Sequence, residues 1–190
     1  MTVRRAAVAV ALALALAGCG SATEPKAAAP VPSSVPVTAP FKGLRPTSVK
    51  IPKIGADSSL ISVGLKTDGS ISVPSVHKPM QAAWYQLSPV PGDVGPAVVL
   101  GHVDGDKQPG IFYKLKDLAP GDEVDVDRSD GKKLKFVVDR VTQVPKDTFP
   151  RDAVYGNSDK PELRLITCGG AFDHAEHSYK DNVIVYANLA

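Results

Sequence analysis

Apolar and polar residues alternate along most of the chain from residue 45 onward. In residues 123–128, EVDVDR, valines alternate with aspartates, and in residues 132–144 the apolar side chains again fall on one face. This period of two is typical of half-buried β-strands. Runs of this kind predict nine strands, at residues 48–54, 60–66, 70–74, 82–87, 96–103, 123–128, 132–144, 162–168 and 182–189.

Turn residues separate these runs, and there is little sign of helix. Asp68-Gly69 and Asp130-Gly131 lie between predicted strands, where residues that tolerate positive φ favour hairpin turns. Residues 110–118 could form one short helix. Its buried side is predicted to carry Phe112, Leu115 and Leu118. The pattern therefore predicts an all-β domain, either a barrel or a sandwich.

The first twenty residues have the features of an export signal. Two arginines precede an apolar run at 6–17 that is short for a span of about 20 residues. The run ends at Leu-Ala-Gly-Cys, which resembles the lipobox of bacterial lipoproteins and predicts lipidation of Cys19. An uncleaved anchor helix and an ordinary secretory signal are the alternatives, and all three predict export to the outer face of the membrane.

Composition separates a linker from the folded domain. Residues 21–44 are rich in Pro, Ala and Ser and offer too little bulky apolar surface for a core, so we expect a tether there. The domain is predicted at residues 45–190. The formal net charge is +2, which gives no electrostatic reason to expect a nucleic-acid partner.

Cys168 is the main candidate for chemistry. It ends the apolar run LRLITCGG, and the only other cysteine, Cys19, is expected to be lipidated or removed. An unpaired cysteine in an exported protein is either buried and inert or a nucleophile. Thr167 precedes it, and Gly169 and Gly170 follow with bare backbone that a substrate could approach, so the setting favours a nucleophile.

A thiol nucleophile needs a base or a cationic neighbour. Among the four histidines, His102 ends another apolar strand in AVVLGHVDG and is the first candidate. His177 is the second, in a polar loop after the cysteine that also holds His174, and His77 has no matching strand. We expect no cofactor, and the loop histidines lack the ligand framework of a metal site.

Three segments together resemble the sortase family of cysteine transpeptidases, in particular the class F sortases of actinobacteria. They are GHVDG, LITCGG and the closing SYKDNVIVYA, and the similarity covers residues 45–190. The resemblance implies a closed β-barrel of about eight strands with short helices. It also implies cleavage of an LPXTG-type sorting signal between Thr and Gly, through a thioacyl-enzyme. An amine of a peptidoglycan precursor or a pilin then resolves that intermediate.

By position in the family motif, Cys168 is the nucleophile and His102 the acid/base. Two departures stand out. Arg164 replaces the first Thr of the signature, and we expect it to line the substrate groove together with Thr167 and Gly169. Lys180 occupies the position of the family's catalytic Arg; it keeps the charge but loses the planar bidentate fork.

Other cysteine enzymes fit less well. Papain-like peptidases place the cysteine before the histidine, and L,D-transpeptidases carry an arginine just after the cysteine, where this chain has Gly169 and Gly170. The alternative outside enzymology is a surface lipoprotein that uses a sortase-like barrel to bind peptides. We expect a monomer that is held at the membrane by its N-terminal anchor.

Overall fold

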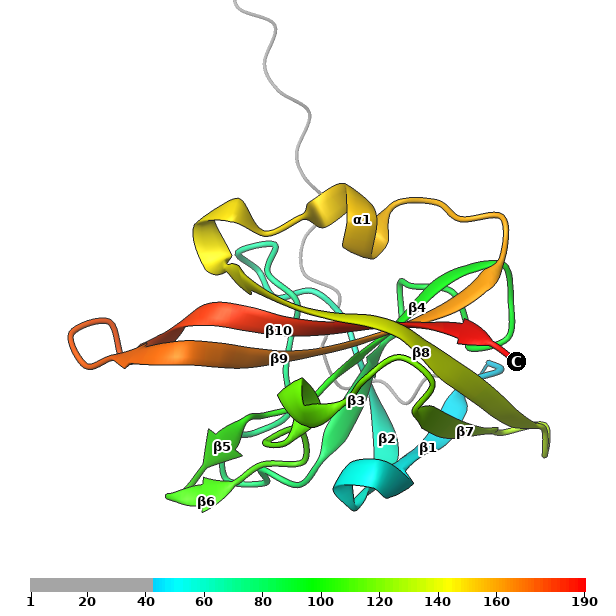
Figure 1. Cartoon of the computed structure of the whole chain (residues 1–190), viewed down its shortest axis with the longest axis horizontal. Helices are drawn as coiled ribbons and strands as arrows, with labels where there is room; N and C mark the ends of the chain where they lie inside the picture. The colour runs from blue at the N-terminus through cyan, green and yellow to red at the C-terminus, as the bar shows by residue number, and fades with distance from the viewer. Residues whose placement is uncertain (1–42) are drawn as a thin grey trace, which may run out of the picture. The chain divides into compact units, whose positions relative to one another are not determined.

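Eight strands close into a barrel in the computed structural model, which describes residues 43–190 (Figure 1). Their order around the barrel is β1-β2-β3-β4-β9-β10-β8-β7. The strands are β1 (Pro46–Ile51), β2 (Ala56–Val63), β3 (Ala82–Tyr85), β4 (Gly95–Leu100), β7 (Glu123–Arg128), β8 (Lys133–Pro145), β9 (Pro161–Asp173) and β10 (Ser178–Leu189). The predicted all-β fold with a closed barrel is confirmed.

The remaining elements are short. A two-stranded hairpin, β5 (Asp104–Gly105) and β6 (Gln108–Pro109), follows β4, and the helix α1 (Arg151–Tyr155) crosses the outside of the barrel. Three single turns of 3₁₀-helix complete the described chain: η1 (Pro52–Ile54), η2 (Leu115–Asp117) and η3 (Lys146–Thr148). Among residues 43–190, no helix has both the length and the apolar character needed to cross a bilayer.

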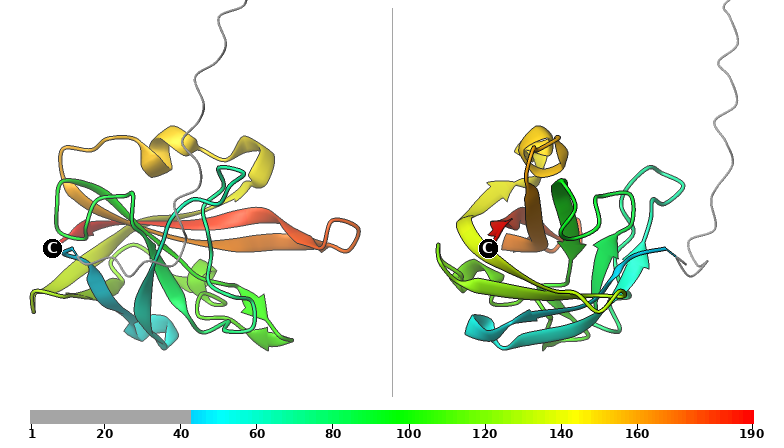
Figure 2. Two further views of the ribbon diagram at one scale, coloured as in Figure 1. Left: turned by 180° about the vertical axis from the view of Figure 1, so that it is seen from behind. Right: turned by 90° about the vertical axis from the view of Figure 1, so that its right-hand side faces the viewer.

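Most strand pairs are antiparallel, but β2–β3 and β4–β9 are parallel. A parallel pair needs a crossover connection. The connection from β4 to β9 contains the β5–β6 hairpin and α1, which lie outside the barrel wall. The view along the barrel in Figure 2 shows α1 and its flanking turns above the wall. The long β9–β10 hairpin extends past the barrel on the side where β5 and β6 lie (Figure 1).

Two local predictions differ from the structure. Residues 70–74 form only an isolated bridge, Leu65 with Ile71, because the turn at Gly69 closes a very short hairpin that Pro74 cannot extend. Residues 110–118 form turns and η2 instead of one helix. The three apolar side chains expected on its inner side are nonetheless buried: Phe112, Leu115 and Leu118.

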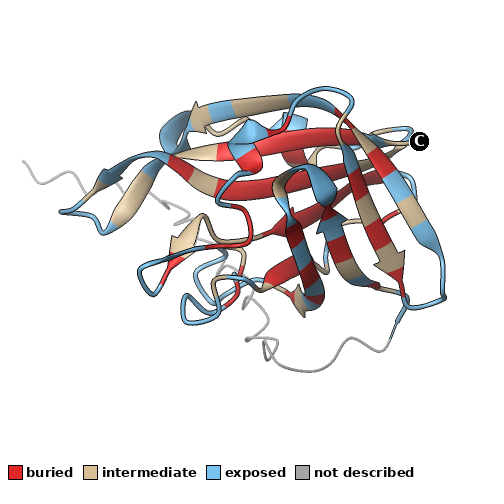
Figure 3. Cartoon of the chain, turned by 60° about the horizontal axis from the view of Figure 1, so that its bottom comes forward, coloured by how far each residue is buried: buried red, intermediate tan, exposed pale blue. Residues whose placement is uncertain are grey.

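The central strands are buried on both faces, which produces two apolar clusters. Odd-numbered residues of β9, such as Leu165, face the barrel interior with Phe136 and Val99. Even-numbered residues, such as Ile166, belong to a second cluster on the outer face, which Val154 of α1 covers. Figure 3 shows this buried band along β9 and β10.

The two-cluster arrangement gives the two faces of β9 separate surroundings.

Residues 1–42, and with them the predicted signal segment, Cys19 and nearly all of the predicted tether, lie outside the described residues. Their assignments stay predictions.

Candidate active site

Cys168 lies on β9 as a half-buried free thiol, and by strand alternation it shares the outer face with Ile166. Its partner across the antiparallel ladder is Asn182 of β10. Just beyond this pair the register shifts, so that two residues of β9 oppose one of β10. The thiol therefore lies one pair away from Gly169–Asp181, the last regular pair before a bulge.

Gly170 makes this bulge possible. Its φ is +74°, a value that L side chains rarely adopt. A Cβ at this position would also lie 2.3 Å from the Asp181 carboxylate. At Gly169 a Cβ would lie 2.8 Å from a Val183 methyl group. The two glycines predicted to leave bare backbone beside the thiol are thus required by the local geometry.

Strand register places His102 and Cys168 at the same end of two neighbouring strands. The parallel β4–β9 ladder ends with Leu100 opposite Ile166, and the Gly101 amide donates to the Ile166 carbonyl oxygen at 3.2 Å. His102 follows two residues after Leu100, beyond the end of β4, whereas Cys168 follows two residues after Ile166 within β9, which continues to Asp173. The prediction that each residue ends its strand is therefore wrong, but both candidates, 66 residues apart in the sequence, lie toward the same end of this strand pair.

The half-buried His102 ring is held by a neighbouring loop. Its Nε2 lies 2.7 Å from the carbonyl oxygen of Pro74, and its own carbonyl oxygen accepts a 3.0 Å bond from the Phe112 amide. Gly110 packs so closely that a Cβ there would lie 2.3 Å from the His102 oxygen. These contacts fix both the backbone and the ring of His102.

A second contact joins the loop after His102 to the strand after Cys168. The Tyr179 hydroxyl on β10 donates a hydrogen bond to the Asp104 carboxylate. This bond, more than burial, raises the pKa of Tyr179 to about 12. Neither residue is among those predicted from the sequence. No spacing signal identifies them, because their contact depends on the fold.

Lys180 lies on the β9–β10 hairpin, two residues before the partner of Cys168. Its side chain is 61% exposed and its Nζ lies 3.5 Å from the Asp173 carboxylate. The pKa of Asp173 is lowered mainly by the Ala175 and Glu176 amides, and Lys180 adds to this. The ammonium of Lys180 is therefore near the site but paired with Asp173.

Arg164 is almost fully buried. Its guanidinium pairs with Glu162, donates a 3.4 Å bond to the carbonyl oxygen of Ala153 in α1, and lies 4.6 Å from the centre of the Tyr186 ring. These contacts attach α1 to the sheet. The guanidinium donors of Arg164 therefore already have partners inside the protein. Its contact with substrate stays a prediction.

The other histidines have contacts of their own. His77 is exposed and lies 2.9 Å from Asp106 on the β5–β6 turn. His174 stacks edge-on against Phe172, and His177 has a φ of +47° in the turn of the β9–β10 hairpin. The ranking of His102 over His177 as the base stays a prediction. Within residues 43–190 no three metal-ligating side chains cluster.

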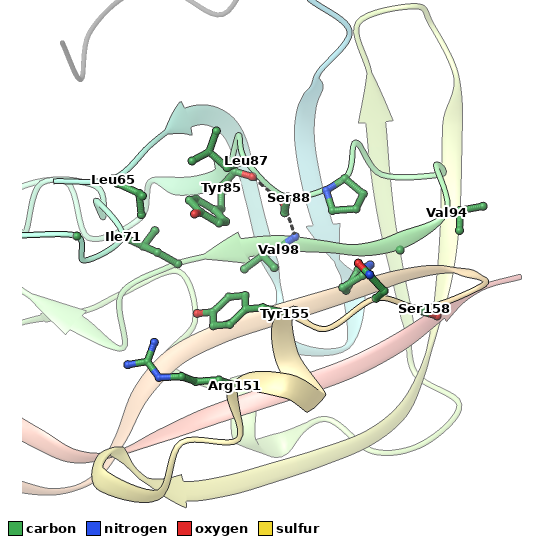
Figure 4. A pocket seen from close by; sticks show the side chains of 15 residues that line it. Leu65, Ile71, Tyr85, Leu87, Ser88, Val94, Val98, Arg151, Tyr155 and Ser158 are labelled. Atoms are coloured by element: carbon green, nitrogen blue, oxygen red, sulfur yellow. Dashed lines mark hydrogen bonds between the residues drawn. The ribbon is translucent and has the colours of Figure 1, made fainter. Parts of the chain in front are cut away.

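Two cavities that share no lining residue border β4 and β9, respectively. The outer cavity, about 700 Å³, is lined by Tyr85, Leu87 and Val98 of β4 on one side and by Tyr155 of α1 on the other (Figure 4). The smaller one, about 360 Å³, is lined by Cys168 itself. We call it the barrel-mouth cavity, and its other walls are Val103, Phe112, Tyr113, Lys116, Gln143, Thr167, Gly169, Gly170, Tyr179 and Val183.

A family model for the sortase domain matches residues 49–190. The chain belongs to the sortase family. Sortases are cysteine transpeptidases, and such an enzyme needs a thiol of the kind that Cys168 supplies on β9. The class F assignment goes beyond what this match supports.

Solved sortases share the fold. Sortase A from Corynebacterium diphtheriae is 23% identical with a TM-score of 0.56, over 75% of this chain and 59% of that one. Sortase C-1 from Actinomyces oris is 19% identical with a TM-score of 0.59, over 75% and 72%. A Clostridium perfringens sortase D5 transpeptidase is 19% identical with a TM-score of 0.55, over 75% and 77%. The chain thus spans less than two thirds of the corynebacterial protein, and no curated protein sequence matches it significantly.

Proposed function

We propose that this protein is a sortase of the class F type, which cleaves an LPXTG-type signal between Thr and Gly and transfers the acyl fragment to an amine. The observation that supports the proposal is the β4–β9 register, which pairs Leu100 with Ile166, two residues before His102 and Cys168. This geometry supports nucleophilic attack by one residue and proton transfer by the other.

The outer face of β4 and β9 suits an extended acyl donor. From Arg164, which pairs with Val98 at the outer cavity, to Cys168 is four residues of β9, or about 13 Å. An extended Leu-Pro-X-Thr segment covers about 10 Å between its Leu and its Thr. A leucine side chain in the apolar cavity would therefore place the threonine carbonyl close to the thiol.

The proposed reaction has two halves. His102 first takes the proton of the Cys168 thiol. The resulting thiolate attacks the threonine carbonyl carbon, the Thr–Gly bond breaks, and His102 passes that proton to the departing glycine amine. An acceptor amine then attacks the thioester carbon, the C–S bond breaks, and His102 takes the proton that the amine loses. Lys180 stabilises the oxyanion in both halves, after it leaves Asp173.

The test uses the purified domain with a fluorogenic peptide that contains LPETG, and an amine. We expect Cys168→Ala to abolish product and His102→Ala to reduce kcat/KM by about 100-fold or more. His77→Ala is the matched control, because His77 is exposed, pairs with Asp106 and does not line the cavity at Cys168. Full turnover by Cys168→Ala would refute the proposal.

The replacement of arginine by Lys180 favours one alternative, a non-enzymatic surface lipoprotein that binds peptides. A thiol-reactive peptide mimic separates the two. If the protein is an enzyme, the mimic should label Cys168, and His102→Ala should slow this labelling strongly. If it is a simple binding module, labelling should not depend on His102.

Anchoring at the outer membrane face through lipidated Cys19 is a separate proposal. Mass spectrometry of the mature N-terminus tests it directly.

A further inference from the structure

Asn182 lies directly opposite Cys168 in the antiparallel ladder between β9 and β10. Directly opposed residues of such a ladder point their side chains to the same face, with Cβ atoms about 4.5–5.5 Å apart. In the barrel, β9 lies between β4 and β10, and His102 follows the end of β4. The proposed base and the Asn182 side chain therefore belong to the two strands that flank the strand of the thiol.

The Asn182 side chain shares the outer face with the proposed acyl donor. Its second ladder partner is Val144 of β8, and both Val144 and Ile184 of β10 belong to the outer apolar cluster. Val183, which separates Asn182 from Ile184, belongs to the interior cluster instead. A hydrogen bond formed in such apolar surroundings is stronger than the same bond in water.

The amide group of Asn182 is unpaired and accessible. The residue is half-buried, and its side chain has no hydrogen-bond partner within the described part of the chain. In that same part, the side-chain atoms that are both enclosed and unpaired are the hydroxyls of Thr142 and Thr167, so the Asn182 amide is still open to a ligand. Its NH2 group offers two hydrogen-bond donors.

We propose that Asn182 is a catalytic residue that donates a hydrogen bond to the oxyanion at the thiol, and this inference rests on the proposed function. When the Cys168 sulfur attacks the acyl donor, the carbonyl oxygen becomes negatively charged, and the carbonyl reforms as the C–N bond breaks. The same oxygen is charged again when the amine attacks the thioester, until the C–S bond breaks. A donor that binds the charged oxygen more strongly than the carbonyl lowers both barriers.

Asn182 and Lys180 would act differently on this oxyanion. Lys180 is 61% exposed and must first leave Asp173, whereas Asn182 has no partner to leave within the described residues. A donor that is already in place costs no reorganisation when the charge develops. Asn182 therefore adds an oxyanion donor that the family motif did not indicate.

The experiment separates stabilisation of the oxyanion from reactivity of the thiol. Loss of a single oxyanion donor typically lowers kcat by about 100-fold or more, so Asn182→Ala should lower kcat for the LPETG peptide by at least about 30-fold and change KM by less than about threefold. Iodoacetamide alkylates a thiolate at a saturated carbon, where no oxyanion forms. Its rate of reaction with Cys168 should therefore be nearly the same in Asn182→Ala as in the wild type.

Asn188→Ala is the matched control. Asn188 is an exposed asparagine on the same strand and face, opposite Glu162 and about 20 Å from Asn182 along β10. This variant should leave both kcat and the alkylation rate unaltered. Asn182→Leu removes the donors but keeps the size of the side chain, and it should lower kcat as Asn182→Ala does even if the alanine variant fails to fold.

The outcomes distinguish this inference from the proposed function. If the wild type does not cleave the peptide, the proposed function fails, and the inference fails with it. If the wild type cleaves the peptide but the folded Asn182 variants keep its kcat, only the role of Asn182 is refuted. Equal falls in kcat and in the alkylation rate would also refute that role, because they would show that Asn182 supports the thiol and not the oxyanion.

Discussion

The His102 ring and the carbonyl oxygen of Pro74 are joined by a 2.7 Å hydrogen bond through Nε2. A carbonyl oxygen can only accept, so Nε2 must carry a proton. In the neutral ring the other nitrogen, Nδ1, is then unprotonated and is the atom able to take a proton. Pro74 is thereby a positioning residue that selects the tautomer of the proposed base.

This tautomer is a direct prediction for nuclear magnetic resonance. Long-range ¹H–¹⁵N correlation at mildly alkaline pH should show His102 with a protonated Nε2 and an unprotonated Nδ1. His102→Gln assigns the signals by removing them. Observation of the opposite tautomer would mean that the Pro74 contact does not persist in solution.

The Tyr179–Asp104 bond predicts an unusual tyrosine titration. The pKa of Tyr179 is raised from 10.0 to about 12, chiefly by its hydrogen bond to Asp104. Because the folded state favours the protonated phenol, the bond's contribution to stability is complete below pH 10 and is lost as pH rises through 12. Asp104→Asn should lower the Tyr179 pKa toward 10, as followed by phenolate absorbance.

Asp106→Asn is the matched control for this titration, because Asp106 contacts His77 and not Tyr179. Tyr179→Phe should also lower kcat, because it removes the link between the His102 loop and β10. If Asp104→Asn leaves every tyrosine pKa where it was, the bond does not form in solution.

Lys180 should be more important for catalysis than for folding. Its pair with Asp173 is exposed, and such pairs contribute little to stability because solvent screens them. We expect Lys180→Ala to lower kcat/KM by about 10- to 100-fold through loss of oxyanion stabilisation, while the free energy of unfolding changes by less than about 0.5 kcal/mol. Peptide cleavage assays and urea denaturation measure the two effects.

The partner variant Asp173→Asn tests whether the pair withholds Lys180 from the substrate. Asparagine keeps a side-chain oxygen for the Ala175 amide, which donates at 2.9 Å, so the turn should persist. Release of Lys180 should raise kcat/KM at least twofold. A fall in kcat/KM would instead mean that Asp173 holds Lys180 in its active position.

Local patterning was sufficient for the strands but not for the contacts between them. Alternation in residues 123–128 gave the bounds of β7, and Asp130-Gly131 marked its hairpin, where Gly131 has a φ of +84°. The parallel register that pairs Leu100 with Ile166 depends on two strands far apart in sequence, which periodicity cannot pair. The family motif related His102 to Cys168 from sequence, and the register places both toward the same end of this strand pair.

Arg164 shows that a residue's face can be predicted from the sequence when its contacts cannot. Alternation placed it on the face of Cys168, and the structure agrees. Its partners, however, are Ala153 in α1 and Tyr186 on β10, and sequence alone gives no reason to bring either of them near. The helix α1 itself is only five residues long, too short to leave a periodic pattern.

Thr167→Val should stabilise the protein. The two side chains have nearly the same shape, and removal of a buried hydroxyl without a partner relieves a cost of about 1 kcal/mol or more. We therefore expect the free energy of unfolding in urea to rise by about 1 kcal/mol. Thr167→Ser, the matched control, keeps the hydroxyl but loses a methyl group, so it should lower that free energy by about 1 kcal/mol. Destabilisation by Thr167→Val would show that the hydroxyl has a partner inside the protein in solution.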